Sequence, residues 1–392
     1  SVSASSFFLE GVLKAPPLAD VRRAETLRSY GEICRGMRAD KNRAGGTVRA
    51  VFAPGETLFP DCNEDVLCGA FPPADEVIFV LPGGGSGFSQ VEERLCGLYA
   101  SCRAKRLDGT LQDTDFLVAR SLSEAMKHCL IESSAGDSII VFSDKQALSE
   151  TKFDVDFITG KSQVPKDLKP FSFFKTGGKS YSGGERFIVG SGSNLWISDF
   201  STDVDFVKSS GPASVPGSTL RIPWMAGIPG TLGGWVKMNA GAFGHSISEV
   251  VSRVKVDGRW IEKCECGFSY RSSSIEGVIE DVELEDEKIS RLQNESRFKD
   301  FLSRRRSFPG RTCGSVFKNP PHGEAAGSLL EKSGAKNLSC GGAFVWSGHA
   351  NVIVAGNGAN SSDILVLASM MRRKVRELFD ISLELEIRFA DG

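Results

Sequence analysis

Two stretches of the chain combine glycine with small polar side chains in a pattern suited to binding a phosphorylated cofactor. The first, Phe187–Leu195 (FIVGSGSNL), is a predicted strand followed by a Gly-Ser-Gly-Ser-Asn turn. The second, Gly227–Gly244 (GIPGTLGGWVKMNAGAFG), contains six glycines. Glycine lets a backbone approach a ligand closely, and clustered backbone N–H groups bind phosphate. The second stretch predicts a backbone wrapped around a large planar, phosphorylated cofactor, whereas the first alone is equally typical of an ordinary turn.

Three later segments carry side chains suited to charge stabilisation and proton transfer. Arg271 lies in FSYRSS, which we expect to be a strand, and its planar guanidinium could hold a carboxylate through two hydrogen bonds. Ser315 follows a glycine in GSVFKNP, so its hydroxyl could be held close to a substrate. Glu384 and Glu386 share one face of a predicted strand at 382–389. Taken singly, a surface arginine, a turn serine and a solvated charged face are more common than functional residues.

The elements that must position these residues lie in regions that differ in composition and in predicted secondary structure. Strands and helices alternate between residues 10 and 155, which predicts a small parallel sheet flanked by helices. The predicted strands are 48–52, 76–81, 115–118 and 137–142, and the predicted helices are 91–103 and 123–131. Two prolines and several lysines at 155–172 predict a linker. The chain is then glycine-rich to about 250 and α+β beyond it, with an amphipathic helix at 361–379.

Composition excludes several classes of function. The chain has 392 residues, enough for two or three domains, and a formal net charge of -2, which gives no general attraction to nucleic acid or anionic membrane. The chain contains no run of about 18 apolar residues, so we expect no membrane span. The first residues are Ser-rich, lack an initiator Met and do not form a convincing signal peptide. The ten cysteines lack the spacing of a zinc site, so we expect buried thiols in a reducing compartment and no bound metal.

Seven segments, in this order and spacing, resemble the MurB family of UDP-N-acetylenolpyruvoylglucosamine reductases. They are GSGSNLWISD, GIPGTLGGWVKMNAGAFG, FSYRSS, RTCGSVFKNP, AGSLLEKSGAK, GHANVIVAGNGANSSDIL and LELEIRF. The resemblance covers residues 173–390, and the short step from Pro320 to Ala326 resembles the compact type II branch. It implies a UDP-sugar nucleotide substrate and the cofactors FAD and NADPH.

The resemblance also implies roles for individual residues. Arg271 would bind and polarise the enolpyruvyl carboxylate, and Ser315 would donate the proton. Glu386 would help to stabilise charge at the reacting carbon, while Tyr270 and Asn319 would hold the sugar nucleotide. The positions implied to line FAD are Gly190, Gly192, Ser193, Asn194, Gly227, Gly230, Thr231, Gly233, Gly234 and Asn239.

The first flavin-binding region is shorter than the family pattern. Phe173–Ser180 (FFKTGGKS) resembles the family's entry segment, yet the strand at Phe187 follows almost at once, and Gly227 follows Asn194 by only 33 positions. We therefore expect a shortened FAD-binding domain. A nucleoside-triphosphate loop is excluded at 177–180, because Phe173 occupies the position where that motif requires glycine.

The N-terminal region resembles, more weakly, the C-terminal domain of a MurC-type muramate ligase. The segments that carry this resemblance are VRAVFAPGETLF, PADEVI and GDSIIVF. The ATP-binding central domain of such ligases is absent, and the ligase His/Arg signature is replaced at 55–57 by Gly-Glu-Thr. We expect no ligase activity here, and instead a vestige, a stabilising platform or a module that docks a protein partner.

The sequence thus predicts a multidomain α+β and α/β protein. The predicted units are a ligase-like α/β domain at 1–155, a linker at 156–172, an FAD-binding domain at 173–250 and a substrate-binding α+β domain at 251–392. The predicted function is reduction of the enolpyruvyl ether of UDP-GlcNAc to UDP-MurNAc, in the bacterial cytoplasm or an organelle, without nucleic-acid binding or membrane insertion. The alternatives are a non-catalytic scaffold of the same fold and another flavoprotein oxidoreductase.

Overall fold

The computed structural model describes most of the chain between residues 20 and 390. The described residues are 20–24, 46–54, 67–69, 71–81, 90–111, 113–132, 137–143, 185–197, 204–208, 213, 222–285, 291–305 and 308–390. The predicted linker, the entry segment at 173–180 and the Gly-Glu-Thr segment at 55–57 lie outside these residues.

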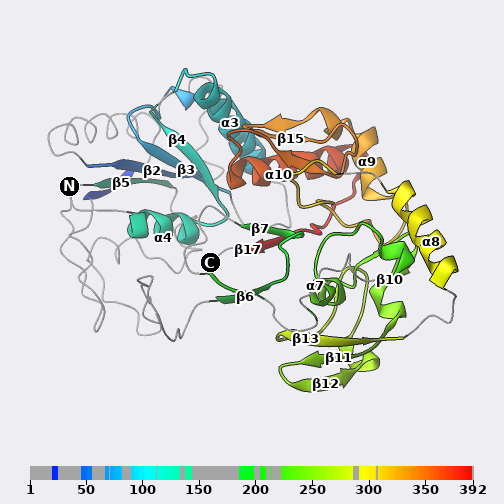
Figure 1. The fold of residues 1–392 in the computed structure, drawn as a ribbon. Helices are drawn as coiled ribbons and strands as arrows, with labels where there is room; N and C mark the ends of the chain where they lie inside the picture. Colours follow the sequence, from blue (N-terminus) through cyan, green and yellow to red (C-terminus); the bar gives the residue numbers. More distant parts are fainter. Residues whose placement is uncertain are drawn as a thin grey trace.

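The N-terminal domain (described between residues 20 and 143) contains the parallel sheet that the sequence predicts (Figure 1). Its strands lie in the order β1-β5-β2-β3-β4. Their bounds are β1 (Asp20–Ala24), β2 (Val48–Ala53), β3 (Glu76–Val80), β4 (Asp115–Ala119) and β5 (Ser138–Ser143). All six residues of β2 are buried, and five of them are apolar, as expected of a central parallel strand that is covered on both faces; the sixth, Arg49, is paired with Glu76 and Asp137. The sequence pattern did not predict β1.

Two helices cover opposite faces of this sheet. Helix α3 (Gln90–Leu107) packs on the face that carries Phe52 and Phe79, and helix α4 (Leu122–Glu132) packs on the face that carries Ile78 and Val141 (Figure 1). Successive residues of a strand point to opposite faces, so Phe79 and Ile78 belong to different cores. Both helices confirm the predicted ones within a few residues.

The central lobe (residues 222–305) is built around the second glycine-rich stretch. Its core contains Trp224, Trp235 and Val254, and a three-stranded antiparallel sheet of order β12-β11-β13 closes it. Its helices are η3 (Pro223–Met225), α7 (Leu232–Lys237), η4 (Ile247–Glu249), η5 (Lys263–Cys266) and α8 (Arg291–Arg304). Its strands are β9 (Gly241–Ala242), β10 (His245–Ser246), β11 (Val251–Val256), β12 (Arg259–Glu262) and β13 (Ile279–Leu284).

The C-terminal lobe (residues 308–390) packs a small antiparallel sheet of order β14-β15-β16 against a long helix. Its elements are α9 (Ala326–Lys332), η6 (Ala335–Asn337), β14 (Ser339–Cys340), β15 (Ala343–Val345), β16 (Ile353–Ala355), α10 (Ser361–Phe379) and β17 (Arg388–Ala390). Helix α10 has the predicted bounds. Asn360 caps it by accepting a hydrogen bond from the backbone N–H of Asp363 at 2.9 Å.

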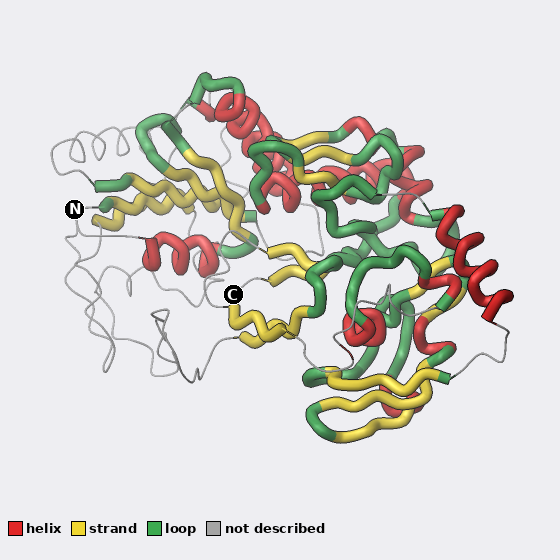
Figure 2. The backbone as a smooth tube through the Cα atoms, viewed as in Figure 1, coloured by secondary structure: helices red, strands yellow, loops and turns green. Residues whose placement is uncertain are grey.

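Of two short parallel strand pairs, one is local and the other connects segments far apart in the sequence (Figure 2). Strand β6 (Glu185–Val189) pairs with β8 (Val204–Lys208), and β7 (Leu195–Ile197) pairs with β17. The end of the C-terminal lobe therefore lies directly beside the first glycine-rich turn.

The continuous strand predicted at 382–389 is wrong. Only Arg388–Ala390 forms a strand, and Leu385 makes a single isolated bridge with Phe317. Burial still alternates, since Leu383 and Ile387 are buried and Glu384 is exposed. The segment has the side-chain pattern of a strand, but its backbone hydrogen bonds are divided between residues 316–318 and Asn194 rather than running to one neighbouring strand.

No described helix is long and apolar enough to cross a membrane. Within the described ranges no group of His, Cys, Asp or Glu side chains has the arrangement of a metal site. The cysteines that the structure describes are free thiols, and six of them are buried: Cys68, Cys96, Cys102, Cys129, Cys266 and Cys340.

Candidate active site

A cleft of about 610 Å³ lies between the central and C-terminal lobes. Its wall contains all five residues to which the sequence resemblance assigns catalytic or substrate-binding roles. They are Tyr270, Arg271, Ser315, Asn319 and Glu386. These residues come from three segments up to 116 positions apart (386 − 270), so only the tertiary fold brings them together.

Arg271 stands on a tight turn, and the prediction that it lies on a strand is wrong. Ser269 and Ser272 form a two-residue bridge, and Arg271 has φ +55°, a left-handed conformation that few non-glycine residues adopt. Its Nε donates to Glu386 Oε1 at 2.7 Å, and its Nη2 donates to Gly241 O at 3.0 Å. A guanidinium carries five N–H donors, so this arrangement fixes the group and leaves donors for a ligand carboxylate.

Glu386 is a half-buried carboxyl, and its surroundings shift its pKa in opposite directions. Burial raises its pKa above the ordinary value, and the positive charge and hydrogen bond of Arg271 only partly offset that effect. Its backbone is held from both sides, because its N–H donates to Val316 O at 2.8 Å and its carbonyl accepts from Asn194 Nδ2 at 3.1 Å. The first glycine-rich turn therefore positions Glu386 directly.

Ser315 is held by a residue to which the sequence analysis gave no role. Gly314 has φ +80°, and Ser315 bridges to Val352 immediately after it. The buried Asn351 then fixes Phe317, two residues after Ser315, since its Oδ1 accepts from Phe317 N at 2.9 Å and its Nδ2 donates to Phe317 O at 2.8 Å. The only sequence signal for Asn351 was its place in the GHANVIV segment.

Tyr270 and Asn319 meet across the cleft. The backbone N–H of Asn319 lies 3.4 Å from Tyr270 Oη, and the Asn319 side chain accepts from Ala326 N at 3.0 Å. Tyr270 is half exposed, at 51%, which leaves its ring available to a ligand. Its ring centroid also lies 5.2 Å from the Arg271 guanidinium.

The two glycine-rich stretches contact each other. A Cβ added at Gly190 would lie 2.4 Å from Thr231 Oγ1, and one added at Gly230 would lie 3.2 Å from Ser193 Oγ. Side chains at these positions would separate the stretches. Gly192 has φ +72° and nothing within 4 Å of an added Cβ, so its backbone faces open space. This combination of close contact and accessible backbone fits a cradle for a phosphorylated cofactor.

Two of the polar residues assigned to this cradle also have structural partners. Thr231 caps helix α7 by accepting from Gly234 N at 3.2 Å. Asn239 is 6% exposed, donates to Ser269 O at 2.8 Å and accepts from Ser248 N at 3.2 Å. Asn239 therefore ties the second stretch to the turn that carries Arg271.

Comparison with known proteins finds similarity to one family. The family model described as UDP-N-acetylenolpyruvoylglucosamine reductase, C-terminal domain, matches residues 305–390. The protein named UDP-N-acetylenolpyruvoylglucosamine reductase 2 of Symbiobacterium thermophilum is 35% identical over 239 residues, covering 52% of this chain and 77% of that protein. The reductase of Halalkalibacterium halodurans is 30% identical over 237 residues, covering 51% of this chain and 78% of that protein.

Other matches are shorter or have lower sequence identity. The reductase of Bacillus velezensis is 34% identical over 185 residues, covering 44% of this chain and 60% of that protein. The crystal structure of UDP-N-acetylenolpyruvylglucosamine reductase (MurB) from Thermus caldophilus covers 52% of this chain and 85% of its own, with 28% identity and a TM-score of 0.47. The two longer alignments each reach at least 30% identity over more than three quarters of the relative, so this chain belongs to the UDP-N-acetylenolpyruvoylglucosamine reductase family.

Proposed function

We propose that this chain reduces the enolpyruvyl ether of UDP-N-acetylglucosamine to UDP-N-acetylmuramate, a precursor of peptidoglycan. The observation that carries the proposal is the convergence of Arg271, Ser315 and Glu386 in one cleft beside the two glycine-rich stretches. Its reductase relatives belong to a family of FAD-dependent oxidoreductases that use NADPH.

The residues present fit FAD. The backbones of Gly190, Gly192, Gly227 and Gly230, with the hydroxyls of Ser193 and Thr231, would hold its pyrophosphate and flavin, and Asn194 and Asn239 would position these stretches against the cleft. When bound, FAD supplies the hydride chemistry, taking hydride from NADPH and passing it to the enol ether. The protein supplies orientation and charge.

Arg271 would bind the enolpyruvyl carboxylate. Negative charge develops toward that carboxylate as the double bond is reduced, and a fixed guanidinium at this place stabilises the developing charge. The hydrogen bonds to Glu386 and Gly241 hold the group before substrate arrives, so little reorganisation is needed during the reaction. Ser315 would then donate the proton to the α-carbon, with its backbone held by Val352 and Asn351.

Glu386 predicts a pH dependence of substrate binding. A substrate carboxylate beside Arg271 adds negative charge near Glu386, so binding should raise the pKa of Glu386 beyond its already raised free-state value. Binding then takes up a proton, and affinity should fall as pH rises from the free-state pKa to the bound-state pKa. Calorimetric titration in buffers of different ionisation enthalpy measures the uptake.

Glu386→Gln should abolish this proton uptake. The matched control is Glu384→Gln, which changes an exposed carboxyl two residues away that pairs with Lys318. Equal proton uptake in the wild type and in Glu386→Gln would contradict the assignment.

We also infer that the N-terminal parallel sheet is a ligase-like domain without ligase activity, that 173–250 binds FAD and that 251–392 binds substrate. The resemblance of VRAVFAPGETLF to a ligase segment, and the Gly-Glu-Thr that replaces the ligase His/Arg signature at 55–57, support the first point.

The visible absorption spectrum of the purified protein tests the function first. A flavin band near roughly 450 nm that NADPH bleaches, and that the enolpyruvyl sugar nucleotide restores, is the expected result. A colourless protein that excess FAD cannot restore would contradict the enzyme assignment and favour the non-catalytic scaffold.

A further inference from the structure

A fully buried carboxylate lies outside the active-site cleft. Asp363, in the first turn of helix α10, is 0% exposed. Within its own lobe its Oδ2 accepts from Gly342 N at 2.9 Å and from Asn360 N at 3.3 Å. Two backbone N–H donors do not neutralise a buried negative charge, which is strongly unfavourable unless it is paired.

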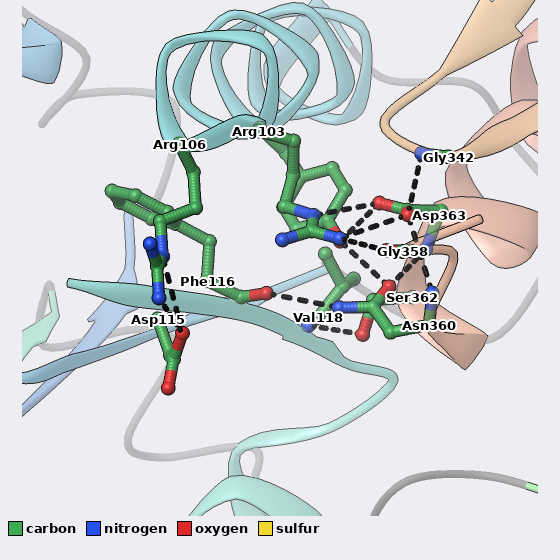
Figure 3. Close-up of polar contacts among 11 residues, drawn as sticks. Arg103, Arg106, Asp115, Phe116, Val118, Gly342, Gly358, Asn360, Ser362 and Asp363 are labelled. Atoms are coloured by element: carbon green, nitrogen blue, oxygen red, sulfur yellow. Dashed lines mark hydrogen bonds and ion pairs between the residues drawn. The ribbon is translucent and has the colours of Figure 1, made fainter. Parts of the chain in front are cut away.

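The partner of Asp363 comes from the N-terminal domain. Arg103 of helix α3 donates from Nε to Asp363 Oδ1 at 2.9 Å and from Nη2 to Asp363 Oδ2 at 3.1 Å (Figure 3). The same Nη2 lies 2.9 Å from Gly358 O, and Tyr99 Oη donates to Asp363 Oδ1 at 2.8 Å. Burial and the charge of Asp363 raise the pKa of Tyr99 well above its usual value, so its hydroxyl stays a donor. The two-pronged pairing is the geometry in which arginine binds carboxylate most strongly.

The contact continues along the edge strand of the N-terminal sheet. Strand β4 ends the sheet, and its Val118 N–H donates to Ser362 Oγ at 2.8 Å (Figure 3). Asn360 Nδ2 reaches Phe116 O at 3.4 Å. The start of α10 therefore covers backbone groups that an exposed edge strand would leave unpaired.

Apolar packing makes the two regions one core. Leu95 and Leu98 of α3 belong to the same buried cluster as Val366, Leu367 and Met371 of α10. Without the N-terminal domain, this face of α10 would be an exposed apolar patch.

A hydrogen-bonded path leads from Asp363 to the wall of the cleft. Asp363 fixes Gly342, which directly precedes β15, and Asn351 and Val352 lie in the loop between β15 and β16. Val352 bridges to Ser315. Arg103 is thus connected to the proposed proton donor through one small sheet.

We propose that the N-terminal domain is an integral part of the reductase fold, and that Arg103 is a positioning residue that holds the Ser315 wall of the cleft through Asp363. The domain would act as a rigid support for the C-terminal lobe, and not as a separately tethered module. The proposal has a structural half, the support that the N-terminal domain gives to the C-terminal lobe, and a catalytic half, the positioning of the Ser315 wall by Arg103. Only the catalytic half rests on the proposed function.

Variants of the full chain test the structural half. Arg103→Ala should lower the thermal unfolding midpoint by roughly 10 °C, because it leaves a buried charge unpaired.

Arg106→Ala is the matched control: Arg106 lies one turn later on α3 and pairs at 3.3 Å with Asp115, whose side chain is 70% exposed (Figure 3). That variant should shift the midpoint by no more than roughly 2 °C. Adding Asp363→Asn to Arg103→Ala should recover about half of the lost unfolding midpoint, because the asparagine side chain at position 363 carries no charge that needs a partner.

The positioning role has its own readout, at a temperature where all variants are folded. In Arg103→Ala, NADPH should reduce the flavin at the wild-type rate, while reoxidation by the enolpyruvyl substrate should slow by about tenfold or more. An Arg103→Ala protein that unfolds like Arg106→Ala would overturn the structural half. Equal slowing of both half-reactions would overturn the positioning role. A flavin-free wild type would refute the proposed function, yet the unfolding comparison would still decide whether the domains form one unit.

Discussion

Replacing Ser315 by alanine is expected to lower turnover of the enolpyruvyl substrate by about 10²–10⁴-fold, the usual contribution of a positioned acid. The loss should fall on kcat, because the hydroxyl acts only as the α-carbon takes up its proton. Binding should change little, since the backbone at this position is held by Val352 and Asn351 rather than by the hydroxyl. Stopped-flow reduction by NADPH and reoxidation by substrate separate the two effects.

The flavin itself should remain in the Ser315→Ala protein. Ser315 belongs to the C-terminal lobe, whereas the stretches that fit the cofactor are at 187–195 and 227–244. Ser333→Ala is the matched control, because that hydroxyl donates to Leu330 O at the end of α9 and does not line the cleft. A Ser315→Ala protein that turns over at the wild-type rate would eliminate the serine as proton donor.

Removal of Arg271 should lower activity by a similar factor, but through substrate binding as well as through kcat. Arg271→Ala should lower kcat/KM by about 10²–10³-fold, because both ground-state binding of the carboxylate and stabilisation of the developing charge are lost. Arg271→Lys should recover little, since a single ammonium cannot reproduce the hydrogen bonds to Glu386 and Gly241 together with a two-pronged contact to substrate.

Arg271→Ala should also change Glu386. Without the charge and hydrogen bond of Arg271, only the weaker effect of Lys318 opposes the rise that burial causes in the pKa of Glu386, so this carboxyl should stay protonated to a higher pH. Arg253→Ala serves as the control, because it removes an arginine of the same lobe that pairs with Glu283 and stacks on Trp260. If steady-state kinetics of Arg271→Ala matched those of Arg253→Ala, the carboxylate-binding role would be wrong.

Much of the secondary structure could be predicted because local patterns determine it. The mostly apolar segments at 48–52 and 76–81 have few alternatives to a buried parallel strand, and the caps and amphipathic face of 361–379 define a helix. The membership of Arg271, Ser315 and Glu386 in one site came from the order of motifs, and no local pattern would have supplied it.

The remaining features depend on contacts between distant residues. Tyr-Arg at 270–271 has the composition of a strand, but the chain reverses there because Ser269 and Ser272 pair with each other. The segment at 382–387 alternates like a strand, yet it has no single partner strand. Nothing near Arg103 in the sequence reveals its partner Asp363, which lies 260 positions away.

The pairing of β7 with β17 has a consequence for biosynthesis. Asn194 binds the carbonyl of Glu386 across 192 positions, and Arg103 of α3 pairs with Asp363 of α10 across 260 positions. A ribosome releases the N-terminal sheet well before α10 exists, so the apolar face of α3 leaves the exit tunnel uncovered. Such long-range closure is slow and leaves nascent chains prone to aggregation. Chaperones that bind exposed apolar surface are therefore expected to retain this protein until α10 has been synthesised.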